Sequence, residues 1–311
     1  MFSPNFPDQL RVENKSYRSF LADYAKLFFS TDRPDYDLAT QSIIAIAGKK
    51  TATFKLVALE PGIFSGLEEL NYWFTSLGIK KVNFRISDGD YFSSGQTLLV
   101  ITGELSLLLS YERFFLNYLT RVLGITTKCH SLQKRVETSF THKIGLASTR
   151  KSPLILIDKK AALIGGVLTH RLNLEQAAIY KDNHQGGGLD EVLEAIERLN
   201  LTTSQERQVD FVEIEIDKPD QLPLLIDFLK PRIFNFPVGI MFDNFRPSDL
   251  KPLLEEFSGE SALNAIFLEA SGGINEKNLE DYDLPRLNLL SSSMFTNNFQ
   301  AIDLSFELES K

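Results

Sequence analysis

The chain has 311 residues, which is long enough for two ordinary domains or for one barrel with an appendage. Its 33 basic and 41 acidic side chains give a net charge of −8, which argues against nonspecific nucleic-acid binding because that needs a basic surface. A single cysteine, Cys129, excludes a disulfide within the chain, and no stretch approaches the roughly 20 apolar residues that span a bilayer. We therefore expect a soluble protein of the cytoplasm that binds neither nucleic acid nor membrane.

The first third of the chain mixes helical and strand patterns. Apolar residues at helical spacing predict helices over residues 16–28 and 64–77. Alternating apolar residues predict strands over 51–59, 82–87 and 97–102, and the last two flank a turn-rich segment. These elements indicate an α/β domain at the start of the chain.

A helix with two distinct faces is predicted over residues 111–124. Its apolar face contains Phe115, Leu119 and Val122. Its polar stripe, in steps of four residues, contains Arg113, Asn117 and Arg121.

Six short apolar runs follow and alternate with helical segments. The runs cover residues 144–147, 177–180, 211–216, 238–242, 265–268 and 287–290. Helices are predicted over 189–199, 221–229 and 247–257. Repeated alternation of strand and helix predicts a parallel sheet, either open or closed into a barrel, and residues 301–308 read as one further strand.

Polar or charged side chains stand at the end of each of the six runs. In chain order they are Arg150 and Lys151, Lys181, Glu213 and Glu215, Asp243, Glu269 with the triplet Ser271-Gly272-Gly273, and Ser291 to Ser293. In an α/β barrel the carboxyl ends of all parallel strands meet on one face, where active sites are built. We therefore expect these residues to gather in one site.

The residue types in this set predict a site for a metal-bound polyanion. Arginine and lysine side chains suit carboxylates and phosphates, and Arg171 adds a further cation. Glu215 and Asp243 offer hard oxygen ligands to Mg²⁺. The serine–glycine triplet can present backbone N–H groups to a phosphate, and His170 is a candidate only because of these neighbours. Zinc-ligand spacings and Walker or Rossmann glycine patterns do not occur in the sequence.

These residues, in this order, resemble the motifs of the quinolinate phosphoribosyltransferase family. The segment 148–184, STRKSPLILIDKKAALIGGVLTHRLNLEQAAIYKDNH, is similar to the family pattern of TRKT, GGG, HR and IKDNH. VEIEI at 212–216 resembles VEVEV, IMFDN at 240–244 resembles IMLDN, and LEASGGI at 268–274 matches in full. Upstream, ERFFLN at 112–117 resembles ERTALN, and the DGD-containing segment 88–103 also matches. The resemblance covers the chain from about residue 57 to its end.

The resemblance implies an α/β barrel of phosphoribosyltransferase type II with an N-terminal α/β sandwich domain. We expect the sandwich over residues 1–115, completed by a C-terminal strand within 300–311, and the catalytic barrel over 116–299. The resemblance also implies a homodimer or hexamer with shared active sites, in which Arg113 reaches into the site of a neighbouring subunit.

The activity implied by the resemblance is Mg²⁺-dependent phosphoribosyl transfer from phosphoribosyl pyrophosphate to quinolinate. Decarboxylation would then give nicotinate mononucleotide for NAD biosynthesis. The implied carboxylate ligands are Arg150, His170, Arg171 and Lys181. The implied pyrophosphate and phosphate ligands are Arg113, Lys151 and Lys181, with Ser271, Gly272, Gly273, Ser292 and Ser293 at the 5′-phosphate. The implied metal ligands are Glu215 and Asp243, and the catalytic set is Arg113, Lys151, Lys181, Glu215 and Asp243.

Three alternative interpretations stay open. A nicotinate-type enzyme, or a paralogue of the kind found beside molybdate transport genes, would share most of these motifs, although so many cations favour a dicarboxylate. A catalytically silent relative that binds a nucleotide is the second, suggested by Ser293 in a turn where the family usually has glycine. The third, a phosphate-binding barrel lyase, would use Lys181 to form a Schiff base.

Overall fold

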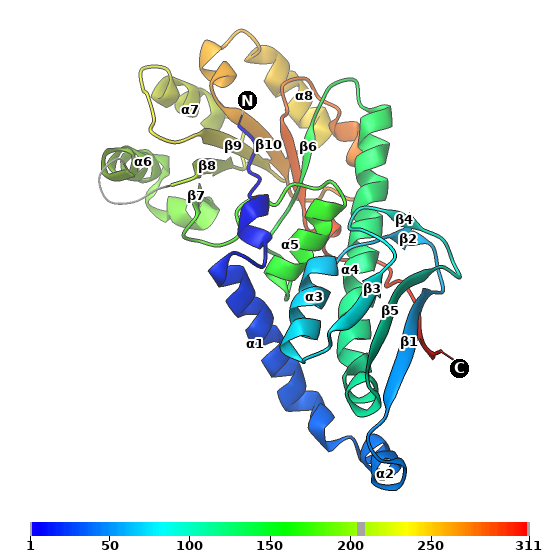
Figure 1. The fold of residues 1–311 in the computed structure, drawn as a ribbon. Helices are drawn as coiled ribbons and strands as arrows, with labels where there is room; N and C mark the ends of the chain where they lie inside the picture. Colours follow the sequence, from blue (N-terminus) through cyan, green and yellow to red (C-terminus); the bar gives the residue numbers. More distant parts are fainter. Residues whose placement is uncertain (1, 204–208, 310–311) are drawn as a thin grey trace. The chain divides into compact units, whose positions relative to one another are not determined.

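The computed structural model describes residues 2–203 and 209–309, and the chain forms two compact units (Figure 1). The first, here called the parallel-sheet unit, contains the residues up to Phe6, Leu132–Ile155 and Gly166–Asn297. The second, here called the sandwich unit, contains Pro7–Ser131, Leu156–Gly165 and the residues from Asn298 onward. The domain boundaries expected at residues 115 and 299 stay predictions. The expected last strand was placed within residues 300–311, of which residues 310 and 311 lie outside the described part of the chain.

Six parallel strands form the sheet of the parallel-sheet unit, in the order β6-β11-β10-β9-β8-β7. They are β6 (Gly145–Ser148), β7 (Ala177–Tyr180), β8 (Phe211–Ile216), β9 (Val238–Asp243), β10 (Phe267–Ser271) and β11 (Leu289–Ser292). Leu168 adds a parallel bridge to Ala147 beyond β6. The sheet is a half-barrel, which confirms the predicted fold class.

Helices connect successive strands of this sheet, as a parallel arrangement requires. They are α6 (Leu189–Thr203), α7 (Gln221–Leu229) and α8 (Pro247–Glu256), all on one side of the sheet (Figure 1). Short 3₁₀ turns complete the connections: η3 (Asp182–Gly187), η4 (Ser261–Asn264), η5 (Leu279–Tyr282) and η6 (Ser293–Phe295).

The inner face of the half-barrel begins with an apolar layer at the amino ends of the strands. Phe211 and Phe267, the first residues of β8 and β10, lie with ring centroids 5.8 Å apart. Phe2 packs against both rings, at 5.6 Å and 5.5 Å, and Phe6 stacks on Phe211 at 6.4 Å. Gly239 is required opposite them, because a Cβ atom there would lie 2.3 Å from the Phe267 ring. The first residues of the chain thus cover the end of the half-barrel opposite the expected site.

The sandwich unit is built on a four-stranded antiparallel sheet in the order β12-β1-β5-β3. Its strands are β1 (Thr51–Ala58), β3 (Lys81–Phe84), β5 (Thr97–Glu104) and β12 (Leu304–Leu308), with a separate short pair of β2 (Gly62–Ile63) and β4 (Tyr91–Phe92). The C-terminal strand β12 pairs with β1 from Ala58↔Leu304 to Phe54↔Leu308. Its helices and turns are η1 (Pro7–Leu10), α1 (Lys15–Asp32), η2 (Pro34–Tyr36), α2 (Leu38–Ala47) and α3 (Leu67–Ser76).

Helix α4 (Leu105–Ser139) is far longer than the helix predicted over 111–124. The predicted range stopped at Gly124, and the helix continues past this glycine to Ser139. The glycine lies within α4 because the backbone of Gln300 passes so close that a Cβ atom would lie 2.2 Å from its carbonyl oxygen. Close approach of two backbones, and not helix termination, explains this glycine.

Other element boundaries also differ from the predictions. Helix α3 starts at Leu67 and not at residue 64, because Gly66 has a φ of 100° and Asp88 Oδ1 accepts the first helical N–H at 3.1 Å. Helix α5 (Ile155–Ile164) was not predicted, because its mixed apolar and lysine pattern lacks a clear period. Strands β10 and β11 begin two residues later than predicted and so reach into the serine-rich ends, Ser271 and Ser292.

Candidate active site

An ion pair and a neighbouring carboxylate stand at the carboxyl ends of β7, β8 and β9. Lys181 Nζ lies 2.5 Å from Glu215 Oε2. Burial and the charge of Glu215 raise the pKa of the half-buried Asp243, whereas the charges of Lys181 and Lys151 lower it. Asp243 therefore lies within electrostatic reach of Glu215, Lys181 and Lys151. The repulsion between the two carboxylates is what a bound cation would relieve.

Two arginines are held near each other on the same unit. Arg171 and Arg150 are both half-buried, and burial followed by the charge of Arg150 lowers the pKa of Arg171. Arg171 Nη1 donates to the carbonyl oxygen of Ala177 at 2.8 Å, which fixes one arm of the guanidinium group. Like charges that act on each other in a partly desolvated place favour the binding of an anion.

The glycine turn after β10 needs its glycines. Gly272 and Gly273 have φ values of 80° and 67°, in the left-handed region that favours glycine. A Cβ atom on Gly272 would lie 2.3 Å from Asn244 Oδ1, and Asn244 N donates to the Ser271 carbonyl at 2.8 Å. Asn244 Nδ2 also donates to Asp243 Oδ2 at 2.6 Å, so this one residue holds the turn through its backbone and the carboxylate through its side chain.

The last strand end is linked to this turn. Ser292 Oγ donates to the Ile274 carbonyl at 2.7 Å and accepts from Met294 N at 3.2 Å, so the hydroxyl is engaged within the protein. Ser293 begins the short turn η6 and is half-buried. Lys151 is joined to the end of this turn, because Asn297 Nδ2 donates to its carbonyl oxygen at 3.0 Å.

His170 lies beneath the strand ends and is buried. Its Nε2 lies 3.0 Å from Glu269 Oε2 and 3.5 Å from Glu213 Oε2. Its Nδ1 accepts the backbone N–H of Arg171 at 2.9 Å. Both ring nitrogens therefore make contacts within the protein, and direct contact of His170 with a ring acid stays a prediction.

The expected site residues fall into two groups in the structure. The parallel-sheet unit holds Arg150, Lys151, His170, Arg171, Lys181, Glu215, Asp243, Ser271, Gly272, Gly273, Ser292 and Ser293. Arg113 belongs to α4 in the sandwich unit, where it is exposed and lines a hollow of about 530 Å³ together with Arg33 and Asp37.

Three strand residues to which the family resemblance assigned no ligand role complete the layer around His170. Glu213, Glu269 and Ser291 are all buried, and Ser291 Oγ donates to Glu269 Oε1. Glu213 has no hydrogen-bond partner on either carboxylate oxygen. A signal for these residues was present in the sequence, because Glu213 and Glu269 stand two residues before Glu215 and Ser271, and alternate residues of a strand share a face.

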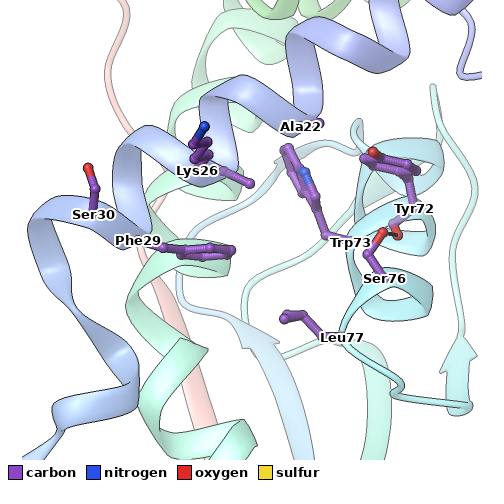
Figure 2. Close-up of a pocket in the computed structure, with 9 residues that line it drawn as sticks. Ala22, Lys26, Phe29, Ser30, Tyr72, Trp73, Ser76 and Leu77 are labelled. Carbon is purple, nitrogen blue, oxygen red and sulfur yellow. Dashed lines mark hydrogen bonds between the residues drawn. The ribbon is translucent and has the colours of Figure 1, made fainter.

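A separate hollow lies in the sandwich unit between α1 and α3, with a volume of about 490 Å³ (Figure 2). Trp73, Tyr72 and Phe29 line it, with Lys26 at one side. Its described lining contains none of the expected site residues, so this hollow is not the candidate active site.

A parallel half-barrel whose strand ends gather cations, carboxylates and a glycine turn is the architecture of an enzyme for anionic substrates. Two family models match the chain. The quinolinate phosphoribosyl transferase N-terminal domain matches residues 37–123, and the C-terminal domain matches residues 125–307. The chain therefore belongs to the quinolinate phosphoribosyl transferase family and is a pentosyltransferase.

Similar proteins agree with this family. A probable nicotinate-nucleotide pyrophosphorylase (carboxylating) from Methanocaldococcus jannaschii is 30% identical, over 88% of this chain and 91% of that relative. One of the same description from Methanothermobacter thermautotrophicus is 28% identical, over 88% and 93%. The structure of the nicotinate-nucleotide pyrophosphorylase from Francisella tularensis matches with a TM-score of 0.76 at 22% identity, covering 94% of this chain and 96% of that one, which shows the same fold. Within the described residues, no helix is long and apolar enough to cross a membrane.

Proposed function

We propose that the protein transfers the phosphoribosyl group of phosphoribosyl pyrophosphate to quinolinate and releases CO₂, giving nicotinate mononucleotide for NAD biosynthesis. The observation that supports this most is that Arg150 and Arg171 are both half-buried and act on each other electrostatically, because two such cations suit a substrate with two carboxylates. The carboxylating pyrophosphorylases among the relatives are named for the same reaction.

In this proposal the ring acid binds through three cations. Arg150 and Arg171 take its carboxylates, and Lys181 lies at the border between the ring acid and the pyrophosphate. Lys181 is paired with Glu215 and its side chain is 43% exposed, so a substrate carboxylate or phosphate can compete for it. His170 supports this group from the buried layer below.

The residues present fit a divalent cation. Glu215 and Asp243 lie on neighbouring strands, they repel each other, and Asn244 occupies one oxygen of Asp243. We propose that these two carboxylates hold Mg²⁺ together with the pyrophosphate and ribose oxygens of the substrate. The ion would supply neutralisation of the charge that develops on pyrophosphate. We place Lys151 at the same phosphate groups, with Arg113 contributed by a neighbouring subunit of a dimer or hexamer.

The 5′-phosphate binds in this proposal at the two turns that follow β10 and β11. Gly272 and Gly273 have positive φ values and bear no side chains, so we assign their backbone N–H groups to this phosphate, together with the N–H of Ser293 at the start of the second turn. Because Ser292 Oγ is engaged by Ile274 and Met294, this serine acts as a brace for the turn.

The reaction then follows from orientation and charge. The bond between C1 of the ribose and the pyrophosphate oxygen breaks, and the electron pair leaves with the pyrophosphate facing Lys151 and Lys181. The lone pair of the pyridine nitrogen forms the new bond to C1. The carboxylate at ring carbon 2 leaves as CO₂, its bonding pair stays on that carbon beside the positive nitrogen, and a proton then replaces it. The protein supplies preorganised charge and no covalent nucleophile.

Product analysis tests this proposal. The protein is incubated with phosphoribosyl pyrophosphate and Mg²⁺, with quinolinate in one reaction and nicotinate in another, and nicotinate mononucleotide and CO₂ are followed. The expected result is mononucleotide with equimolar CO₂ from quinolinate alone, and loss of turnover with a chelator. Product only from nicotinate would contradict the decarboxylating assignment. Absence of product in both reactions would favour the molybdate-associated or nucleotide-binding alternatives, and borohydride trapping of Lys181 would support the lyase.

A further inference from the structure

The buried layer of the half-barrel contains a hydrogen-bonded chain that ends at a substrate-binding arginine. Ser291 Oγ donates to Glu269 Oε1, and Glu269 Oε2 lies 3.0 Å from His170 Nε2. His170 Nδ1 in turn accepts the backbone N–H of Arg171 at 2.9 Å. The next side chain is the Arg171 guanidinium group, whose Nη1 donates to Ala177. Strands β11 and β10 are thus connected through one imidazole ring to the residue that we place on the ring acid.

The contacts of His170 determine which nitrogen bears hydrogen. A backbone N–H pointing at Nδ1 needs a lone pair there, so the ring hydrogen belongs on Nε2, where Glu269 accepts it. Burial lowers the pKa of His170 and the charges of Glu269 and Glu213 raise it, to about 9, which would favour a second ring hydrogen. The Arg171 contact decides against this second hydrogen. The backbone N–H of Arg171 already places a hydrogen between the two nitrogens, and a hydrogen on Nδ1 would collide with it.

A metal ion is the competing explanation of the same cluster. His170, Glu213 and Glu269 offer ligand atoms within 4.8 Å of one another, and all three are buried. A metal can bind Nε2 only when that nitrogen carries no hydrogen. The hydrogen of the neutral ring would then be on Nδ1, where it would point at the backbone N–H of Arg171. The Arg171 contact therefore argues against metal binding through the imidazole.

The backbone at this point is also strained. His170 has a φ of 48°, in the left-handed region that a residue with a Cβ atom adopts at a cost. Such a conformation persists only where neighbouring contacts hold it, and Glu269 is the nearer of the two carboxylates that face the ring. Orientation of Arg171 thus depends on a glutamate from a different strand.

We propose that Glu269 is a positioning residue for ring-acid binding: it fixes His170 as the Nε2–H tautomer, and His170 then fixes the backbone from which Arg171 reaches the carboxylate. This inference rests on the proposed function for its kinetic readout only. Ser291 donates a hydrogen bond to the other carboxylate oxygen of Glu269 and so helps to hold Glu269 in place.

Two substitutions at one position separate orientation from charge. Glu269→Gln keeps a carbonyl oxygen that accepts from His170 Nε2, whereas Glu269→Leu removes the acceptor. We expect Glu269→Leu to raise KM for quinolinate on the order of tenfold to a hundredfold, with KM for phosphoribosyl pyrophosphate changed by less than about threefold. Glu269→Gln is expected to restore KM for quinolinate to within about threefold of the parent protein.

A control variant tests for general disruption of a buried carboxylate. Glu69 in the sandwich unit is equally buried and accepts hydrogen bonds from Tyr17 at 2.9 Å and Tyr118 at 3.1 Å. Glu69→Gln is expected to leave the ratio of the two KM values unchanged. An equal rise in both KM values for Glu269→Leu, or equal impairment of the Gln and Leu variants, would overturn the proposal.

The tautomer is measured without any turnover. Long-range ¹H–¹⁵N spectra of ¹⁵N-histidine-labelled protein resolve four imidazoles, and a His170→Asn variant assigns the one of interest. We expect Nδ1 of His170 to be the nitrogen without hydrogen in the parent protein and in Glu269→Gln, and the tautomer preference to be lost in Glu269→Leu. A doubly protonated ring, hydrogen on Nδ1, or a zinc-induced shift of this resonance would overturn the proposal. Failure of quinolinate turnover with the expected spectra would instead overturn only the proposed function.

Discussion

Glu213→Gln is expected to stabilise the parallel-sheet unit. Glu213 is fully buried, and neither of its carboxylate oxygens has a hydrogen-bond partner. An unsatisfied buried polar group costs roughly 1–3 kcal/mol, and removing an unpaired buried charge stabilises by a similar amount. Glutamine keeps the shape and removes the charge, so we expect the free energy of unfolding of this unit to rise by about 2 kcal/mol at neutral pH.

The expected gain depends on pH with a definite sign. Burial and the charge of Glu269 raise the pKa of Glu213 in the folded protein. A carboxyl group whose folded pKa lies above its unfolded value stabilises the fold below the unfolded value, and this contribution is lost as pH rises through the folded pKa. The parent protein and Glu213→Gln should therefore be nearly equal in stability at about pH 4 and should diverge toward about pH 7.5.

Hydrogen exchange measures this prediction where it applies. Peptides covering β8 and its neighbour β9 report the opening free energy of the parallel-sheet unit, with a chelator present so that bound metal does not contribute. A peptide covering β1 and its neighbour β5 in the sandwich unit serves as the internal control. Faster exchange of β8 in Glu213→Gln at neutral pH, or a gain that is equally large at about pH 4, would refute the reasoning.

The remaining predictions concern the metal carboxylate, the shared site and the cysteine. Asp243→Asn is expected to lower turnover by at least about a hundredfold while keeping the fold. It should also abolish the rise in melting temperature that Mg²⁺ with pyrophosphate gives the parent protein. A rise in melting temperature that persists in the variant would contradict the metal assignment. Arg113→Ala and Arg171→Ala should each be inactive, and mixing the two variants should restore part of the activity. No recovery in mixed assemblies whose subunits are shown to exchange would contradict the shared site. Cys129 is fully buried and burial raises the pKa of its thiol, so a thiol reagent should label it only after denaturant is added, as absorbance at the reagent's wavelength will show.

The parallel sheet was predictable from the sequence because its signal is local. The runs 177–180 and 211–216 coincide with β7 and β8, and 221–229 coincides with α7. Short apolar runs bounded by polar residues, with helices between them, leave few other arrangements. The strand-end residues were predictable for the same reason, since parallel strands bring their carboxyl ends to one face.

Contacts between distant segments were not predictable from local patterns. The predicted helix stopped at Gly124, whereas α4 continues to Ser139, and the glycine is required by the backbone of Gln300, far away in the sequence. The start of α3 at Leu67 depends on Asp88, which serves as a cap from outside the helix. In both cases the local pattern was sound and a tertiary contact decided the outcome.

The inner face of β8 shows why the sequence assigned no role to the buried layer. The strand alternates apolar and acidic residues from Val212 to Ile216, which in an isolated strand indicates one buried and one solvated face. Every residue of β8 is buried, so the acidic face points into the half-barrel and not into solvent. Both faces of β8 are therefore buried. The apolar face packs against the helices, and the acidic face lies in the polar interior beneath the strand ends.

Costly features of the molecule converge on this polar interior. His170 and Asn244 have positive φ values of 48° and 59°, Gly272 cannot bear a side chain beside Asn244, and Glu213 lies buried without a hydrogen-bond partner. Each of these features lowers the stability of the fold. Selection for stability alone would favour substitutions that remove them. They meet around the same strand ends that hold Arg171, Glu215 and Asp243. The simplest physical reason is that the concentrated charge and fixed orientation of these strand ends are incompatible with an optimally stable core at this place.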